Sequence, residues 1–261
     1  MIQTLMRWGL ALLALAVSPM AWAQPVPNIA AASDLRLALA AVAAEFRRDT
    51  GQQVKLTFGS SGNFYRQLRQ GAPFQLFLSA DEDYILKLAK AGKTMGTGQL
   101  YAVGRLALVA PKGSPLLVDS KLAGLRAALR QGKIARFAIA NPEHAPYGER
   151  AAQALKHTKL WPPLSRKLVL GENVAQALQF AISGGAQGGI VAYSLVLDPA
   201  FKARADFALL PASWHQPLRQ RVVLMKGAGS VAQRFYLYLQ QAPARAILAR
   251  HGFALPKPPR A

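Results

Sequence analysis

The chain has 261 residues and no cysteine, which excludes disulfides, thiol catalysis and cysteine-bound metals. Its 32 Lys and Arg outnumber its 12 Asp and Glu, so the formal net charge is +20 and the protein attracts anions. The basic residues are scattered along the chain instead of forming one block, which favours a solvated basic surface over a nucleic-acid site. The length suffices for one large or two small domains with a substantial core.

Residues 1–23 have the pattern of a secretory signal peptide. One positive charge at Arg7 precedes an apolar run over residues 8–17, and the triplet Ala-Trp-Ala at 21–23 forms an A-x-A cleavage site. The apolar run is shorter than the roughly 20 residues that span a bilayer, so a membrane anchor is disfavoured. We therefore expect a soluble mature protein that begins near Gln24 and is exported, most simply to the bacterial periplasm.

Strands and helices alternate through the first part of the chain. Short apolar or alternating runs predict strands over residues 28–32, 54–58 and 74–80. Apolar residues at helical spacing follow each run, and glycines mark where helices stop. Alternation of this kind predicts a parallel α/β sheet.

The rest of the chain repeats this pattern after a turn. Residues 104–116 indicate a strand that runs into a Pro/Gly/Ser turn, a candidate crossing into a second lobe. A strand near residues 221–227 is a candidate for the crossing back. The predicted organisation is therefore lobe 1 over residues 24–104 plus 220–261, and lobe 2 over residues 105–219.

Four predicted strand-to-helix junctions contain small polar residues or glycine: Ser33-Asp34, Ser60-Ser61-Gly62, 145–148 and 172–174. A helix start has unsatisfied N–H groups and a partial positive charge, which suit an anion. In an open α/β sheet such junctions gather at the carboxyl ends of the strands, where ligands bind. Each junction alone also fits a plain helix cap, because Ser and Asp are common N-caps. Their coincidence favours an anion-binding site.

The sequence has no motif for catalysis. Residues 59–63 read Gly-Ser-Ser-Gly-Asn and lack the G-x-S-x-G nucleophile elbow. The four histidines have no metal-binding spacing, and His144 is interpreted as a loop residue with a structural or solvent-facing role. We therefore expect a binding protein that is not an enzyme and has no cofactor. Two alternatives remain: an exported serine hydrolase that uses Ser61, and a polyanion-binding protein with steeply salt-dependent binding.

Six segments that span essentially the whole mature chain resemble one known family. They are AAASDLRLALAAVAAEFRRDTG, FGSSGNFYRQLRQGAPFQLFLSAD, GRLALVAPKGS, IANPEHAPYGERAAQAL, GENVAQALQFAISGGAQGGIVAYS and ARAILARHGF. Their order and combination resemble the periplasmic binding proteins of molybdate ABC importers. The resemblance implies a class II periplasmic binding protein with two α/β lobes, each a mostly parallel sheet flanked by helices, and an oxyanion in the cleft between them.

The resemblance also implies the ligand and the partners. It implies a monomer that binds no nucleic acid and delivers molybdate or tungstate to a membrane ABC permease. Another tetrahedral oxyanion, such as sulfate, is the alternative within this class. The ion is expected to be bound through its oxygens, with no direct protein ligand to the metal.

Five site residues follow from the matching motifs. Ser33 is expected to donate its hydroxyl. Asp34 is expected to offer only its backbone N–H and to cap the helix with its side chain, because a carboxylate repels a dianion. Ser61 supplies a hydroxyl and an N–H, and Tyr147 and Val174 supply backbone N–H groups from the other lobe. Such neutral donors suffice because hydrogen bonds to a charged group are stronger than neutral ones.

One position departs from the family. Many relatives have a tyrosine hydroxyl donor where this chain has Ala192, followed by Tyr193. A shift of one residue along a strand turns the side chain to the opposite face. We therefore expect Tyr193 to miss the ligand and the phenol of Tyr147 to help close the site. In the second loop, Ser60 is expected to be structural, and Gly62 is expected to let the loop approach the ion.

Overall fold

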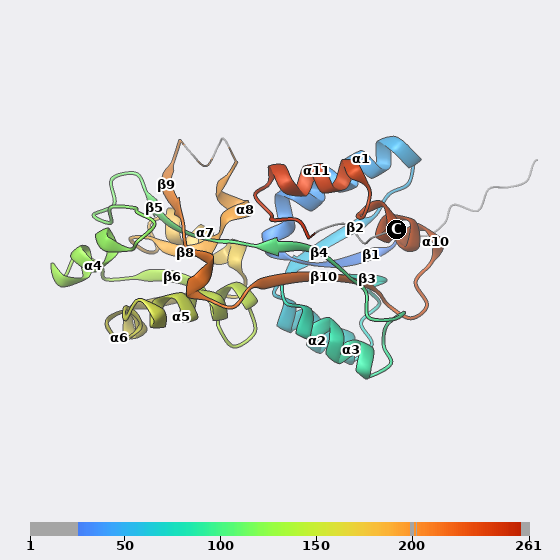
Figure 1. Cartoon of the computed structure of the whole chain (residues 1–261), viewed down its shortest axis with the longest axis horizontal. Coiled ribbons are helices and arrows are strands. Elements are labelled where there is room, and N and C mark those ends of the chain that lie inside the picture. The colour runs from blue at the N-terminus through green and yellow to red at the C-terminus, as the bar shows by residue number, and fades with distance from the viewer. Residues whose placement is uncertain (1–25, 199–200, 202, 257–261) are drawn as a thin grey trace, which may run out of the picture.

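The computed structural model describes residues 26–198, 201 and 203–256. The predicted signal peptide and its cleavage site lie outside the described residues. Figure 1 shows two lobes side by side, each built on one sheet with helices packed against it. The predicted two-lobed α/β fold is therefore confirmed. In the described part of the chain, no helix combines the length and the apolarity that a membrane span requires.

Lobe 1 contains a five-stranded sheet with the order β2-β1-β3-β10-β4. β1 pairs in parallel with β2 and β3, whereas β10 pairs antiparallel with β3 and β4. All strands of this sheet except β10 therefore run in one direction, which agrees with a mostly parallel sheet. The strands are β1 (Asn28–Ala32), β2 (Lys55–Gly59), β3 (Leu76–Ser79), β4 (Gln99–Gly104) and β10 (Leu218–Leu224).

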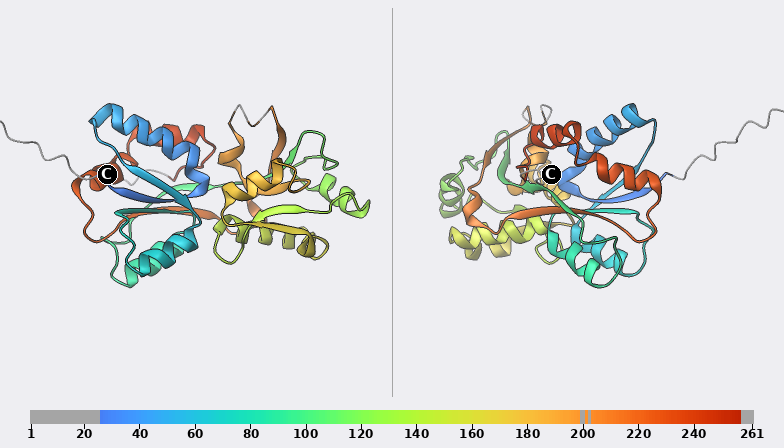
Figure 2. Two further views of the ribbon diagram at one scale, coloured as in Figure 1. Left: turned by 180° about the vertical axis from the view of Figure 1, so that it is seen from behind. Right: turned by 45° about the vertical axis from the view of Figure 1, so that its right-hand side comes forward.

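The helices of lobe 1 cover both faces of this sheet, as the two views of Figure 2 show. Ile29 and Ala31 of β1 pack toward α1, α10 and α11, while Ala30 packs toward α2 and α3. Successive strand residues thus meet different helices, as a period of two requires. The helices are α1 (Arg36–Thr50), α2 (Ser61–Arg69), α3 (Glu82–Lys90), α10 (Ser230–Tyr238) and α11 (Ala242–Arg250), and a 3-10 helix, Ser33–Leu35, precedes α1.

Lobe 2 repeats the plan with the order β7-β6-β8-β5-β9. β6 is parallel to β7 and β8, and β5 is antiparallel to β8 and β9. The strands are β5 (Leu106–Pro111), β6 (Phe137–Ala140), β7 (Leu168–Gly171), β8 (Gly189–Ala192) and β9 (Ala205–Leu209). The helices are α4 (Ala123–Arg130), α5 (Pro146–His157), α6 (Trp161–Leu164), α7 (Val174–Ile182) and α8 (Tyr193–Val196), with 3-10 helices at Ser165–Lys167 and Ala212–Trp214.

Two extended connections join the lobes. The chain leaves the first sheet at Gly104, the end of β4, and enters the second sheet at Leu106, the start of β5. It returns between Leu209, the end of β9, and Leu218, the start of β10. Paired connections of this kind let two rigid lobes open and close about a hinge.

Some elements differ from the sequence expectation. The strand expected in residues 104–116 is β5, whereas β4, which ends at Gly104, was not predicted. The strand β9 was likewise not predicted. These segments have too few alternating residues for periodicity to mark them, and they become strands because neighbouring strands pair with them.

Candidate functional site

The structure brings the five predicted site residues together in one cavity between the lobes. Ser33, Asp34 and Ser61 line it from lobe 1, and Tyr147 and Val174 line it from lobe 2. The other lining residues are small and leave a narrow space, with a volume of about 10 Å³. All five residues belong to segments that follow β1, β2, β6 or β7, so the carboxyl ends of parallel strands from both sheets meet here.

Each serine hydroxyl in this set already accepts a hydrogen bond. Ser33 Oγ accepts from the backbone N–H of Ala175 in the other lobe at 3.3 Å, and Ser61 Oγ accepts from the N–H of Ala80 at 3.0 Å. A hydroxyl has one hydrogen and two lone pairs, so each serine can still donate its hydrogen. The cavity wall therefore offers two hydroxyl donors to an acceptor.

The start of α2 leaves one N–H group for a ligand. Ser60 is the N-cap, and its Oγ accepts from the N–H of Asn63 at 3.4 Å. The N–H of Gly62 donates to the backbone oxygen of His144 in lobe 2 at 2.9 Å. Ser61, the first residue of the helix, has no intrahelical partner for its own N–H. Its hydroxyl and its N–H therefore belong to the same helix start.

The helices α5 and α7 begin at the cavity in a similar way. Asn173 caps α7 by accepting from the N–H groups of the second and third helical residues at 3.1 and 3.2 Å. The N–H of Val174, the first residue, is the one that this cap does not use. In α5 the first residue is Pro146, which has no N–H, so Tyr147 has the first N–H of that helix. Both N–H groups come from residues that line the cavity.

The lining of this cavity contains no basic side chain among the described residues. Its donors are hydroxyls and helix-start N–H groups, which suit an anion because their dipoles are fixed by the fold. In the described part of the chain, no three His, Cys, Asp or Glu residues are grouped so that they could bind a metal ion. The arrangement can therefore bind an oxyanion through its oxygens.

The position of the Asp34 side chain corrects the prediction that it caps the helix. Its Oδ2 accepts from the phenol of Tyr147 at 3.0 Å and from the side-chain amide of Gln220. Its Oδ1 is buried and makes no hydrogen bond. Asp34 is 1% exposed, so its carboxylate is shielded from solvent. It therefore accepts hydrogen bonds from the protein donors nearest to it, which lie on lobe 2 and on β10. The Tyr147 hydroxyl thus donates its hydrogen bond to Asp34. We had expected this phenol to help close the site on the ligand.

Asp34 belongs to a buried polar network that sequence analysis missed. The Tyr101 hydroxyl on β4 donates to Gln220 Oε1 at 2.7 Å, and Gln220 in turn donates to Asp34. Burial raises the pKa of Asp34 from 3.8 to about 6, although the hydrogen bonds from Gln220 and Tyr147 and the backbone N–H groups of Asp34 and Leu35 lower it. Burial and the nearby Asp34 carboxylate raise the pKa of Tyr101 and of Tyr147 well above 10, so both phenols stay protonated. No local motif in the sequence marks Gln220.

A second cross-lobe contact lies at the edge of the cavity. Ser60 Oγ is 3.0 Å from His144 Nδ1, and Glu172 Oε2 is 3.5 Å from His144 Nε2. Glu172 also accepts from the side chain of Asn63 in lobe 1. The structural role expected for Ser60 and His144 is thus observed, and both side chains are buried. A Cβ on Gly62 would lie 2.5 Å from the His144 oxygen, so this glycine allows close contact between the lobes.

Tyr193 does not line the cavity in the structure. Strand β8 ends at Ala192, and Tyr193 is the first residue of α8. Its ring packs against Phe207, with the centroids 6.0 Å apart. The expected reason, a side chain on the opposite face of a strand, is wrong, because the chain turns into a helix at this residue.

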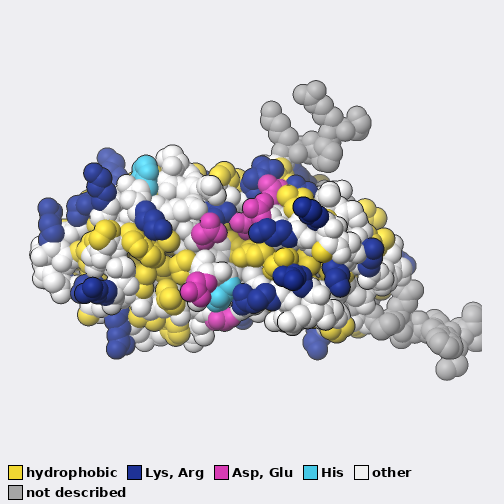
Figure 3. All heavy atoms as spheres, turned by 90° about the horizontal axis from the view of Figure 1, so that it is seen from below, with side chains coloured by type: hydrophobic (Ala, Val, Ile, Leu, Met, Phe, Trp, Pro, Cys, Tyr) yellow, Lys and Arg dark blue, Asp and Glu magenta, His cyan; other side chains and the backbone are white. Residues whose placement is uncertain are grey.

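Charged side chains are distributed unevenly where the lobes meet. On the face shown in Figure 3, Lys and Arg are spread over the surface, while Asp and Glu gather near the middle. One ion pair crosses the boundary: Arg150 of α5 lies 2.7 Å from Asp81 before α3, and both side chains are largely buried. Acidic residues at the boundary therefore help to join the lobes.

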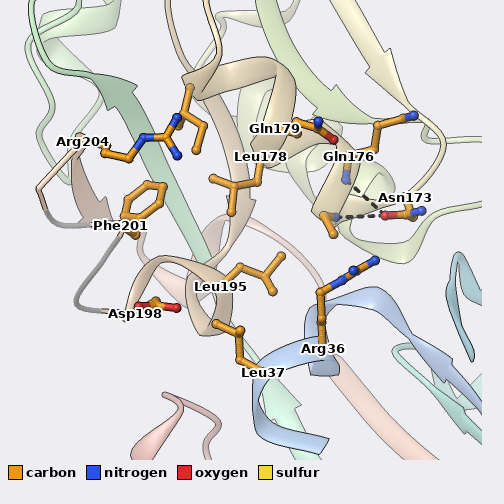
Figure 4. Close-up of a pocket in the computed structure, with 12 residues that line it drawn as sticks. Arg36, Leu37, Asn173, Gln176, Leu178, Gln179, Leu195, Asp198, Phe201 and Arg204 are labelled. Atoms are coloured by element: carbon orange, nitrogen blue, oxygen red, sulfur yellow. Dashed lines mark hydrogen bonds between the residues drawn. The ribbon is translucent and has the colours of Figure 1, made fainter. Parts of the chain in front are cut away.

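A wider pocket of about 550 Å³ opens beside the cavity, between α1 and α7. Arg36 lines it from lobe 1 and Asn173 from lobe 2, and Figure 4 shows the Arg36 side chain extending toward Asn173. Arg36 follows Ser33 by three residues, and Asn173 precedes Val174, so this pocket adjoins the cavity. Its wall contains the basic Arg36 and Arg204 and the acidic Asp198, so its formal charge is positive and attracts anions.

Comparison with known proteins identifies the family. The profile of the family described as bacterial extracellular solute-binding protein matches residues 27–254. A molybdate-binding protein of Azotobacter vinelandii is 36% identical over 231 residues, which cover 87% of this chain and 89% of the relative. A molybdate-binding protein of Rhodobacter capsulatus is 37% identical over 215 residues, covering 81% of each chain.

Solved structures agree with this result. The periplasmic molybdate-binding protein of Azotobacter vinelandii superposes with a TM-score of 0.81 at 31% identity, covering 88% of this chain and 100% of that one. The sulfate-binding protein SubI of Mycobacterium tuberculosis has a TM-score of 0.73 at 15% identity, a likeness of fold alone. The chain belongs to the bacterial extracellular solute-binding proteins and, within them, to the family of the molybdate-binding proteins.

Proposed function

We propose that this protein captures molybdate or tungstate in the periplasm and delivers the ion to a membrane ABC permease. It acts as a monomeric binding protein, without a cofactor and without catalysis. The five residues Ser33, Asp34, Ser61, Tyr147 and Val174 surround the ion. Ser33 and Ser61 donate their hydroxyls, and Asp34, Ser61, Tyr147 and Val174 donate backbone N–H groups.

The observation that supports this proposal most is the donor set of the closed cavity. Each of two hydroxyls accepts a hydrogen bond from a backbone N–H group and keeps its hydrogen for a ligand, and the first residues of helices from both lobes line the same space. A tetrahedral dianion accepts hydrogen bonds at every oxygen and donates none, so it matches a shell of donors. The bonds to it are charge-assisted and therefore stronger than neutral ones.

Closure explains how the bound ion would be recognised by a permease. Contacts between Gly62 and His144 and between Arg150 and Asp81 join the lobes around the cavity. A ligand bonded to donors of both lobes binds the closed form better than the open form, so it shifts the population toward closure. The closed shape then differs from the empty, open one and can signal that the ion is present.

The serine hydrolase alternative finds little support at this site. Ser61 Oγ bonds to a backbone N–H, and the serine that meets a histidine is Ser60, which is also the N-cap of α2. Ser60 and His144 come from different lobes, so they meet only when the lobes close around a small cavity. A nucleophile and its base must be assembled while a larger substrate is bound, which this arrangement prevents.

Thermal unfolding of ligand-free protein with each oxyanion in turn tests the proposed function. Molybdate or tungstate at about a hundred times its dissociation constant adds about 2.7 kcal/mol of stability, which raises the Tm clearly. Sulfate should give a smaller shift, because a smaller ion makes longer hydrogen bonds to donors that the two lobes hold in place. Hydrogen phosphate should also give a smaller shift, because its proton would point at a donor.

Three outcomes would contradict the proposal. If folded, ligand-free protein shows no shift with molybdate or with tungstate, the cavity does not bind these ions. A larger shift with sulfate than with either would favour the alternative oxyanion. If only polyanions stabilise the protein, and this stabilisation falls steeply as salt is added, the protein would instead be a polyanion-binding protein.

A further inference from the structure

The Asp34 carboxylate is an unusual component of an anion site. It is buried, it belongs to a residue that lines the cavity, and its Oδ1 has no hydrogen-bond partner. A carboxylate at this position opposes the binding of a dianion, because the two have charge of the same sign. Its presence beside hydroxyl and N–H donors therefore needs a physical explanation.

No cation offsets the charge of this carboxylate within the described residues. The titratable groups that interact with it are the phenols of Tyr101 on β4 and Tyr147 on α5, and both are neutral. The helix α1 begins with the charged Arg36, two residues after Asp34, and this side chain extends toward Asn173 (Figure 4). The remaining elements around the 3-10 helix contribute uncharged groups: Gln220 from β10, Ser194 from α8, Val174 from α7 and Gly59 from β2. Ser194 Oγ donates to the backbone oxygen of Asp34 at 2.8 Å, which fixes this residue further.

We propose that Asp34 takes up one proton when the oxyanion enters the cavity, so that the closed complex pairs the ion with a neutral carboxylic acid. This inference rests on the proposed function of the cavity. The proton comes from the acid form of the solvent buffer and is added to the carboxylate. No other bond is made or broken.

The hydrogen-bond geometry shows where this proton would lie. Oδ2 already accepts from Tyr147 and from Gln220, whereas Oδ1 has no partner. The added hydrogen therefore belongs on Oδ1, where it converts an acceptor into a donor. Protonation thus removes a repulsive charge and leaves both hydrogen bonds to Oδ2 in place.

The energetics favour uptake near neutral pH. Burial in the closed structure raises the pKa of Asp34 to about 6 before any charge of the ligand is added. Two carboxylates that share a site raise one pKa strongly, and a dianion has twice the charge of a carboxylate. The pKa of Asp34 in the complex is therefore higher than in the free protein. Between these two values, binding and proton uptake occur together.

The sign of the pH effect follows from this difference. Below the pKa that Asp34 has in the ligand-free protein, this residue is already protonated and the affinity for molybdate is independent of it. Above it, ligand binding must add a proton, so the affinity falls about tenfold per pH unit. The fall ends when the pH exceeds the pKa of the complex.

Calorimetric titration of the mature protein with molybdate in buffers of different ionisation enthalpy measures the proton uptake. At about pH 8 we expect close to one proton taken up per ion bound, declining toward zero as the pH falls below about 6. Asp34→Asn has the same shape and no titration, so it should bind with no proton uptake and with an affinity that does not change over this range.

Two further variants keep the test decisive. Glu149→Gln removes a carboxylate from the start of α5 that does not line the cavity, so its proton uptake should equal that of the wild type. Tyr147→Phe removes a hydrogen bond that lowers the pKa of Asp34, so it should move the onset of the affinity loss to higher pH. The shift in Tyr147→Phe tests the role of Asp34 even if the Asp34→Asn variant does not fold.

The outcomes separate this inference from the proposed function. Tight molybdate binding without proton uptake, or uptake that persists in Asp34→Asn, would overturn the role of Asp34 and leave the function intact. An onset of affinity loss that is unchanged in Tyr147→Phe would also count against Asp34. Absence of molybdate and tungstate binding by folded wild-type protein at every pH would refute the proposed function itself, and this inference with it.

Discussion

The two lobes share one sheet plan but supply different donors to the cavity. Each sheet has three adjacent parallel strands beside an antiparallel one, in the orders β2-β1-β3-β10-β4 and β7-β6-β8-β5-β9. Lobe 1 lines the cavity with the hydroxyl-bearing Ser33 and Ser61, from which we expect hydroxyl as well as main-chain donors, whereas lobe 2 lines it with Tyr147 and Val174, from which we expect main-chain donors alone. The same strand-end geometry can therefore present side-chain or main-chain donors.

This difference assigns separate roles to the lobes. A hydroxyl hydrogen rotates to meet its acceptor, so Ser33 and Ser61 can adapt to the bound ion. The N–H groups at the starts of α5 and α7 have directions set by the helices, so in the proposed complex lobe 2 would define where the oxygens lie. Most substitutions in lobe 2 leave these N–H groups unchanged, and only proline removes one.

The largest expected effect comes from the lobe 1 hydroxyl of Ser61. Ser61→Ala removes one charge-assisted hydrogen bond and leaves the buried N–H of Ala80 without its acceptor. We expect the dissociation constant for molybdate to rise about a hundredfold. Calorimetric titration measures it, and Ser61→Thr, which retains a hydroxyl, is the matched control. An Ala variant that binds as tightly as the wild type would place the donor elsewhere.

A proline at Val174 tests the main-chain donors of lobe 2. Val174 is the first residue of α7, a position where proline fits a helix, and the preceding Asn173 is extended, as a residue before proline prefers. Val174→Pro therefore removes the N–H with little change to the fold. We expect about tenfold weaker binding of molybdate.

Val174→Ala is the matched control for that experiment, because it shortens the side chain and retains the N–H. Its affinity should stay near that of the wild type. Equal affinity for the Pro and Ala variants, with circular dichroism showing intact helices, would mean that lobe 2 does not bind the ion through this group.

The smallest expected effect on binding is at the neighbouring Ser60. Its hydroxyl caps α2 and contacts His144, so Ser60→Ala should lower the free energy of unfolding by about 1 kcal/mol. The affinity for molybdate should fall much less than in Ser61→Ala. Denaturant unfolding and calorimetric titration of the two variants give the comparison. A greater loss of affinity in Ser60→Ala would reverse the roles assigned to the two serines.

Local patterns were sufficient for much of the fold and for the place of the site. Strands 28–32 and 54–58 and the helices after them were predictable, because apolar periodicity and caps depend on residues close in the chain. The junctions could be placed together because parallel strands end at one edge of a sheet. β9 was not predictable, since pairing with β5 makes it a strand.

The partners of Asp34 show where local reasoning ends. Its hydrogen-bond partners Tyr147 and Gln220 are 113 and 186 residues away in the chain. From sequence, the nearest available role for the carboxylate was to cap its own helix. Burial at the meeting point of both lobes instead makes it accept from the donors that are nearest in space.

The sequence by itself determined the alternation of strands and helices, the two lobes of α/β character and the small polar residues at the helix starts, because each depends on interactions within a few turns of chain. The tertiary structure alone decided which donors face the cavity and which face another residue. In the folded protein the phenol of Tyr147 donates to Asp34, and Ser60 contacts His144. Ser61 accepts from Ala80, so its hydroxyl hydrogen is left for a ligand. The first two outcomes depend on contact between two lobes that come from distant parts of the chain, and the third depends on a contact within lobe 1.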